Sequence, residues 1–181
     1  MEGVPPIEDS YDKSLEQQSL AERYYTPRYC VDAEQSHRED FCVLFHSNRI
    51  CVLTLAPSHP LLTESKRVDK ISYDVSPNVD RLTNTVSGKG KRGAQVLTPS
   101  SVIFFVECTD GSRYAIRSCV PGKLVEVNEQ LLENPNLLIE RPADKGYLAI
   151  ILPPIPASTR YKEELLTPQQ YQDHIKQSSN S

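Results

Sequence analysis

Hydrophobic and polar residues alternate in short runs along most of the chain, a pattern typical of half-buried β-strands. Residues 41–46 and 49–55 are two such runs separated only by Ser47 and Asn48. Because two residues are enough to reverse an antiparallel pair, this spacing predicts a β-hairpin with a two-residue turn.

The rest of the chain continues in the same manner. Asp110 and Gly111 form the clearest turn signal, and an Asp-Gly pair favours a type I′ turn, in which both residues have positive φ. Further strands are predicted over residues 70–75, 95–97, 101–108, 112–119, 123–127, 137–139 and 147–152. About eight short strands with turn signals between them predict a mostly β fold.

Helices are predicted near both ends of the chain. Ser14 and Gln17 have the spacing of a capping box, which predicts a helix from Ser14 to about Tyr25, before a proline. Thr167 and Gln170 have the same spacing, with proline at the first helical position, and predict a second helix over residues 167–176.

These patterns divide the chain into four segments. We expect a disordered tail over residues 1–13, an N-terminal helix and linker over 14–34, a β domain over 35–155, and a C-terminal helix and tail over 156–181. No apolar run approaches the ~18 residues that a membrane span needs, and no signal peptide is visible. We therefore expect an intracellular protein without a membrane partner.

The charge and the cysteines narrow the classes of function. The chain has 181 residues with 20 Lys+Arg and 24 Asp+Glu, and its net charge of -4 argues against direct nucleic-acid binding. Five cysteines occur without a CxxC pair. In the predicted hairpin Cys42 and Cys51 would share one face, with His46 at the turn, a poor match to zinc spacing. We predict no metal site and interpret the cysteines as small buried hydrophobes.

Motifs of catalysis are missing from the sequence. It contains no GxSxG, HExxH or GxxxxGK[ST] pattern. Adjacent carboxylates such as Glu163 and Glu164 fall on what the pattern indicates is a solvated helix face. We therefore predict a protein that is not an enzyme.

Two clusters of cations are candidates for partner binding. The first comprises Lys66, Arg67 and Lys70, and the second, spaced by glycines in a segment without a core pattern, comprises Lys89, Lys91 and Arg92. Glycine lets a backbone approach a partner closely, and three cations favour an acidic surface or a phosphate. The second cluster is also a short run of the nuclear-localisation type. A solvated loop is the alternative. An acidic protein is the favoured partner over nucleic acid, because the chain is acidic and aromatics are not interleaved with the cations.

One stretch resembles a known carrier family. Residues 121–135 (PGKLVEVNEQLLENP), followed by residues 146–148, resemble the second half of the glycine-cleavage H protein, and the layout is similar over residues 40–176. This resemblance implies a small flattened β-barrel or sandwich of the lipoyl-domain-like, or hammerhead, type with short flanking helices.

The chain departs from that family at the tip of the second hairpin. A lipoyl carrier presents a lysine there, because the cofactor is joined to its side-chain nitrogen through an amide. The tip consists of Thr109, Asp110, Gly111 and Ser112, none of which is lysine. We therefore predict no bound cofactor and no carrier activity.

A second resemblance covers nearly the whole chain. Residues 46–56 (HSNRICVLTLA), 58–60 and 86–95 (VSGKGKRGAQ) resemble the actin-binding transcription modulator family, also called Abitram or Simiate. Shorter pieces in the same order as in that family are residues 118–120, 126–129 and 146–147.

That resemblance implies a function. It implies a non-enzymatic protein that binds monomeric or filamentous actin and influences filament assembly in filopodia, lamellipodia, growth cones and dendrites. It also implies a place in nuclear speckles, with an effect on transcription through transcription or speckle proteins, besides the cytoplasm.

The resemblance assigns no residue to actin contact. Because actin is acidic, charge points first to Lys89, Lys91 and Arg92 and second to the Lys66, Arg67 and Lys70 cluster. Two alternatives stay open: a cofactor-less adaptor that docks on a lipoyl-type enzyme complex, and a nucleic-acid-associated transcription factor.

Overall fold

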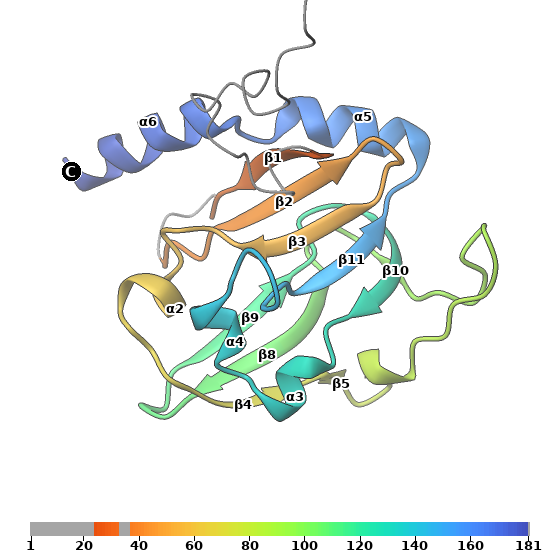
Figure 1. The fold of residues 1–181 in the computed structure, drawn as a ribbon, viewed down its shortest axis with the longest axis horizontal. Coiled ribbons are helices and arrows are strands. Elements are labelled where there is room, and N and C mark those ends of the chain that lie inside the picture. Colours follow the sequence, from red (N-terminus) through yellow and green to blue (C-terminus); the bar gives the residue numbers. More distant parts are fainter. Residues whose placement is uncertain (1–23, 33–36, 181) are drawn as a thin grey trace, which may run out of the picture.

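The computed structural model describes residues 24–32 and 37–180, which fold into three antiparallel sheets (Figure 1). The largest has the strand order β1-β2-β3-β11-β10-β7. Its strands are β1 Tyr25–Cys30, β2 Phe41–His46, β3 Cys51–Leu55, β7 Val96–Leu97, β10 Gly122–Val127 and β11 Ala149–Leu152.

The second sheet has the order β4-β8-β9, and the third pairs β5 with β6. Their strands are β4 Val68–Ser72, β5 Asp74–Ser76, β6 Val79–Asp80, β8 Val102–Cys108 and β9 Arg113–Arg117. The helices are α2 Pro60–Thr63, η2 Arg81–Thr83, α3 Gln130–Glu133, α4 Leu137–Glu140, α5 Ile155–Glu164 and α6 Pro168–Ser179.

The core contains the inward-facing residues of the two larger sheets. Phe104 lies opposite Ile116 across β8 and β9, and Val43 lies opposite Leu53 across β2 and β3. All four side chains are fully buried. Buried residues of the two larger sheets thus supply one continuous core, and the fold class predicted from the sequence, mostly β with short helices, is confirmed.

Strand β1 was not predicted. Residues 25–30 were expected to be the end of a helix and a linker, but they pair with β2 at the edge of the sheet. Pro27 is tolerated there because an edge strand can lack one N–H. The predicted helix from Ser14 otherwise lies outside the described residues, as does the predicted tail over 1–13. The four-segment division of the chain stays a prediction.

The C-terminal helices cover the free edge of β1. The backbone N–H of Tyr29 donates to the Leu166 carbonyl (2.8 Å), and the Leu166 N–H donates back (3.0 Å). The Tyr29 ring also stacks on the Tyr171 ring of α6, with centroids 4.1 Å apart. The predicted capping box of Thr167 and Gln170 is confirmed. An exposed strand edge is thus capped by the chain's own C-terminal segment.

The turn of the first hairpin has three residues, not the predicted two. The His46 N–H donates to the Ile50 carbonyl (2.9 Å), and Arg49 adopts a left-handed conformation with φ 76°. The extra residue shifts the register by one, so Cys42 and Cys51 face opposite sides of the sheet. The prediction that these cysteines share a face was wrong.

The second hairpin turns in the same way. Gly111 has φ 87°, whereas Asp110 is not among the residues with positive φ, and the Cys108 N–H donates to the Ser112 carbonyl (2.9 Å). The loop is therefore the three-residue kind that ends in one left-handed residue, and the predicted type I′ turn was wrong.

Two other strand predictions were wrong or incomplete. Residues 137–139 form part of helix α4, not a strand. Three successive apolar residues carry no period that would distinguish the two, and only Leu138 of them is fully buried. Gly146 lies so close to α4 that an added Cβ would be 2.1 Å from a carbonyl oxygen of the helix. The strand predicted over 70–75 is divided at Tyr73, whose hydroxyl donates to the Asn128 carbonyl (2.8 Å).

Candidate functional site

The second cation cluster lies on a closed turn that projects from the body of the molecule (Figure 1). We call residues 87–93 the basic loop. Ser87 and Arg92 exchange two backbone hydrogen bonds, of 3.0 and 2.9 Å, which close the loop. Gly88 and Lys91 have positive φ (68° and 52°), and glycine at 88 allows this conformation without strain.

The ends of the basic loop are fixed to strand β10. The Asn84 amide donates to the Leu124 carbonyl (2.9 Å) and accepts the Gln95 N–H (2.8 Å). The Lys123 ammonium donates to the Gly90 carbonyl (2.7 Å). A segment in which the sequence shows no core pattern is therefore held in one place relative to the sheet.

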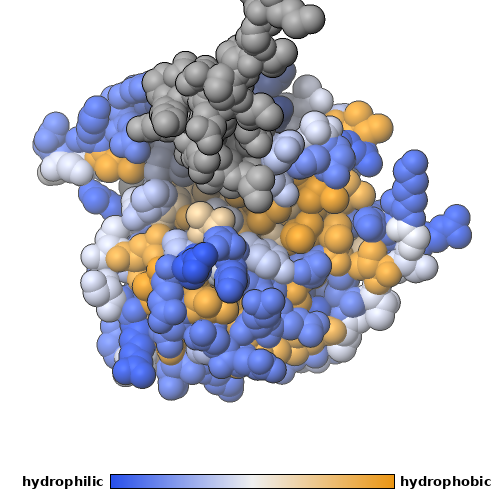
Figure 2. Space-filling view, in the orientation of Figure 1, coloured by the Kyte–Doolittle hydropathy of each residue, from blue (hydrophilic) through white to orange (hydrophobic). Residues whose placement is uncertain are grey.

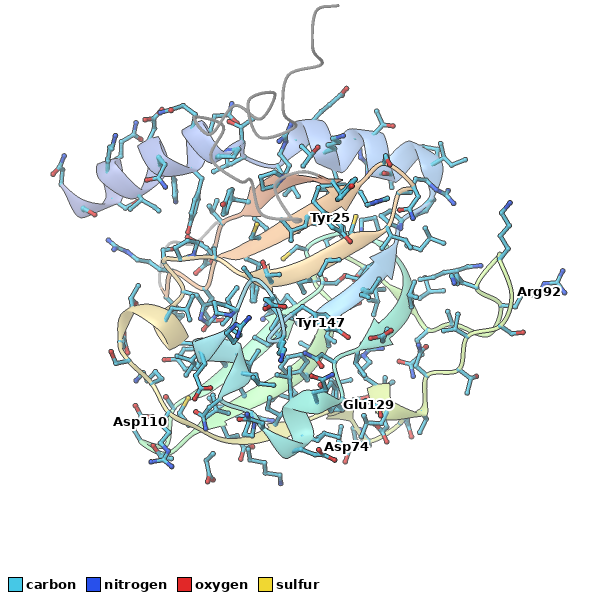
Figure 3. The ribbon with its side chains drawn as sticks, in the orientation of Figure 1. Tyr25, Asp74, Arg92, Asp110, Glu129 and Tyr147 are labelled. Atoms are coloured by element: carbon cyan, nitrogen blue, oxygen red, sulfur yellow. The ribbon has the colours of Figure 1, made fainter. Side chains whose placement is uncertain are left out.

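The three cations of this loop have no ionic partners in the described part of the chain. Lys89 and Arg92 are exposed and Lys91 is half-buried. Figure 3 shows Arg92 pointing away from the body. Unpaired cations on a projecting turn produce a positive potential that is available to an acidic surface.

The first cation cluster is in a different state. The Lys66 ammonium lies 2.6 Å from the Asp110 carboxylate and 3.0 Å from that of Glu64. The hydrogen bond to Asp110, and then that to Glu64, raises the pKa of Lys66. In turn, the hydrogen bond from Lys66, followed by those from Ser112, lowers the pKa of Asp110. Both groups are therefore charged and largely neutralise each other.

The other two cations of that cluster have no ion pair among the described residues, but both lie next to the second hairpin. The Arg67 carbonyl accepts the Thr109 N–H (3.0 Å), which joins it to the hairpin tip. Lys70 lies opposite Glu107 across β4 and β8. This region presents a mixed surface rather than a positive one.

A lysine amine does reach the hairpin tip, which the sequence analysis missed. Lys66 comes from a segment 44 residues before Asp110, so no local pattern could reveal the contact. Its side chain is 15% exposed and held by two carboxylates, whereas a cofactor-bearing lysine must swing freely into solvent. Figure 3 places Asp110 and Arg92 at opposite ends of the molecule.

A groove next to the basic loop was also missed. It has a volume of about 380 Å³, and the residues lining it are Arg49, Lys89, Gly90, Val96, Leu97, Pro121, Gly122, Lys123, Leu152, Pro153 and Pro154. Figure 2 shows hydrophobic surface beside the projecting hydrophilic side chains on this side of the molecule. No carboxylate is among the lining residues, so the groove combines apolar walls with cations.

A metal cluster and a membrane-spanning helix are both absent from residues 24–32 and 37–180. No three His, Cys, Asp or Glu side chains are close enough there to hold a metal ion together. No helix there has the length and hydropathy to cross a membrane.

Burial raises the pKa of the Cys42 thiol to about 11 and that of Cys51 to about 12, so both cysteines are inert packing residues at neutral pH.

Comparisons with known proteins agree with both resemblances. The family model described as glycine cleavage H-protein matches residues 109–178. A glycine cleavage system H protein from Mycobacterium marinum superimposes with a TM-score of 0.52 at 16% identity, covering 82% of this chain and 95% of that one, which supports the fold alone.

Protein Abitram of Homo sapiens is 48% identical over 155 residues, 86% of each chain. That of Gallus gallus is 48% identical over 161 residues, 89% of this chain and 93% of its own. That of Drosophila melanogaster is 39% identical over 173 residues, 96% of this chain and 77% of its own. With such identity over most of its length, the chain belongs to the Abitram family.

Proposed function

We propose that this protein is a non-enzymatic actin-binding protein that modulates filament assembly through its basic loop. Membership of the Abitram family supports the actin partner, since the family is the actin-binding transcription modulator family. The observation that carries the assignment to the loop is the unpaired state of Lys89, Lys91 and Arg92 within the described part of the chain, on a turn fixed to β10.

The physical argument is one of charge. Actin is acidic, so a projecting positive loop attracts it at long range and accelerates association. A turn that is already closed by two backbone hydrogen bonds loses little conformational entropy when it binds. These two properties together favour the basic loop over the Lys66, Arg67 and Lys70 cluster.

The same proposal includes a nuclear role. We place the protein in the nucleus, including speckles, and in the cytoplasm at actin-rich projections, with transcription or speckle proteins as further partners. The overall negative charge of -4 favours a protein partner in the nucleus over direct nucleic-acid contact. A cofactor-less adaptor on a lipoyl-type complex is less favoured, because the hairpin tip that would engage such a complex is covered by the Lys66 ion pairs.

Co-sedimentation with actin filaments, run beside a monomer-binding assay, tests this proposal. The wild-type chain and a variant with Lys89, Lys91 and Arg92 all changed to Ala are compared, with circular dichroism confirming the fold of each. Binding that weakens about tenfold or more in the variant supports both the partner and the site. Unchanged binding keeps actin and rejects the loop, and no binding to either form of actin rejects the partner.

A further inference from the structure

The outer face of the largest sheet forms the floor of the groove beside the basic loop. Lys123 of β10 lies opposite Val96 of β7 on one side and opposite Leu152 of β11 on the other. Directly opposed residues of an antiparallel pair share a face, so these three side chains form one row across three strands. Val96 is 76% exposed, the largest fraction among the exposed large hydrophobic side chains of the described residues.

The charged end of Lys123 is drawn away from this row. Its ammonium bonds to the Gly90 carbonyl of the basic loop (2.7 Å). A lysine held in this way lays its apolar stem along the surface and leaves its charge at the rim. Together with Arg49 and Lys89 it surrounds an apolar floor with three cations.

The backbones of β10 and β11 meet closely at the floor. Gly122 has φ 152°, and an added Cβ would be 2.5 Å from the Leu152 carbonyl oxygen, so only glycine fits at this position. Prolines 153 and 154 follow at once and fix the chain direction. The resulting volume of about 380 Å³ lies near the lower end of the ~300–1,000 Å³ typical of ligand pockets, room for one large side chain.

We propose that this groove binds an acidic peptide segment of a partner protein that carries one large apolar side chain. The apolar residue seats on Val96 and Leu152, and flanking carboxylates pair with Arg49, Lys89 and Lys123. Charge complementarity selects this occupant: the lining contains cations and no carboxylate, whereas a neutral or basic peptide would leave the three cations uncompensated. The basic loop beside this groove lies at the other end of the molecule from the hairpin tip, as Arg92 and Asp110 show in Figure 3.

The test is a titration of the full chain with a defined probe. The probe is a fluorescein-labelled short peptide of aspartate and glutamate with one central phenylalanine, followed by fluorescence anisotropy. Replacing that phenylalanine by glycine is expected to weaken binding about tenfold, and doubling the salt concentration is expected to weaken it severalfold.

Matched variants of the protein complete the test. Val96→Asp is expected to weaken binding of the probe about tenfold, and Lys123→Met about threefold, because the first adds a carboxylate to the floor and the second removes only a rim charge. The control is Leu132→Asp, an exposed apolar residue (47%) on α3, outside the groove, which is expected to leave binding within about twofold. All variants are compared by thermal melting to confirm that they fold.

The proposal is overturned if the probe does not bind saturably, if the glycine peptide binds equally well, or if Val96→Asp behaves like Leu132→Asp. No actin is present, so failure of the actin proposal leaves this titration unaffected. Conversely, loss of probe binding with retained filament binding would reject the groove and keep the proposed function.

Discussion

The two cation clusters have the same number of positive side chains and different surroundings. Lys66 is held between Asp110 and Glu64, and Lys70 lies opposite Glu107 across β4 and β8. The cations of the basic loop have no ionic partners within the described residues, and their loop is tied to the sheet through its backbone. In the first cluster Lys66 therefore joins the hairpin tip to the segment before β4, whereas all three cations of the second cluster are available to a partner.

This contrast separates a structural use of charge from a binding use. An ion pair within the chain satisfies its lysine before any partner arrives, so a partner would have to break it. An unpaired cation on a fixed turn needs only to shed water.

The largest effect concerns His59, close to the hairpin-tip end. It is fully buried before α2, against the rings of Phe41 and Tyr114, and its Nδ1 accepts the Leu61 N–H (3.2 Å). Its Nε2 has no hydrogen-bond partner among the described residues. Burial lowers the pKa of His59 from 6.5 to about 4.

A lowered histidine pKa means that the folded state binds the proton less well than the unfolded state. The contribution of neutral His59 to stability is therefore complete above pH 6.5. The free energy of unfolding is expected to fall by roughly 3 kcal/mol as the pH drops from 6.5 to 4. Urea denaturation at several pH values measures it. His59→Asn keeps an acceptor for the Leu61 N–H and is expected to make the free energy of unfolding depend less on pH between 6.5 and 4. The same pH dependence in both proteins would mean that His59 is not the group responsible.

The next effect concerns stability at the loop end. Changing Lys89, Lys91 and Arg92 together to Ala is expected to alter the free energy of unfolding by less than about 0.5 kcal/mol per residue, because these side chains have no ionic partner to lose. Chemical denaturation checks this. A loss of several kcal/mol would show that the loop cations support the fold, and the contrast with Lys66 would disappear.

The smallest effect is local. Lys66→Met keeps the length of the side chain and removes its charge, so the amides around the hairpin tip, such as that of Ser112, are expected to exchange with deuterium severalfold faster. Amides of the basic loop serve as the internal control and are expected to be unchanged. Equal exchange at the tip in both proteins would mean that the ion pairs do not hold the hairpin.

The sequence carried enough information for the strand pattern and the terminal capping box but not for the details that depend on distant contacts. Pro27 indicated the end of a helix, whereas in the structure it lies in an edge strand that Leu166 covers. Arg49 gave no sign of a left-handed conformation, since non-glycine residues rarely adopt it. One such residue changed the register of the first hairpin and the faces of its cysteines.

The candidate site could also be predicted only where local sequence is enough. Both cation clusters are visible in the sequence, but the ion pair between Lys66 and Asp110 joins segments 44 residues apart. The groove could not be predicted from the sequence, because Val96 and Leu152 come to lie on either side of Lys123 only through the pairing of β7, β10 and β11. Local patterns report which charges exist, and tertiary structure decides which of them are already paired.

Co-sedimentation with actin filaments compares the two cation clusters directly. One variant changes Lys89, Lys91 and Arg92 to Ala, and the other changes Lys66, Arg67 and Lys70 to Ala, so that each removes three positive charges. The first variant is expected to lose about tenfold in affinity for the filament, whereas the second is expected to stay within about twofold of the wild type. Equal losses would show that only net charge matters, and a larger loss in the second variant would mean that the basic loop is not the actin-binding site.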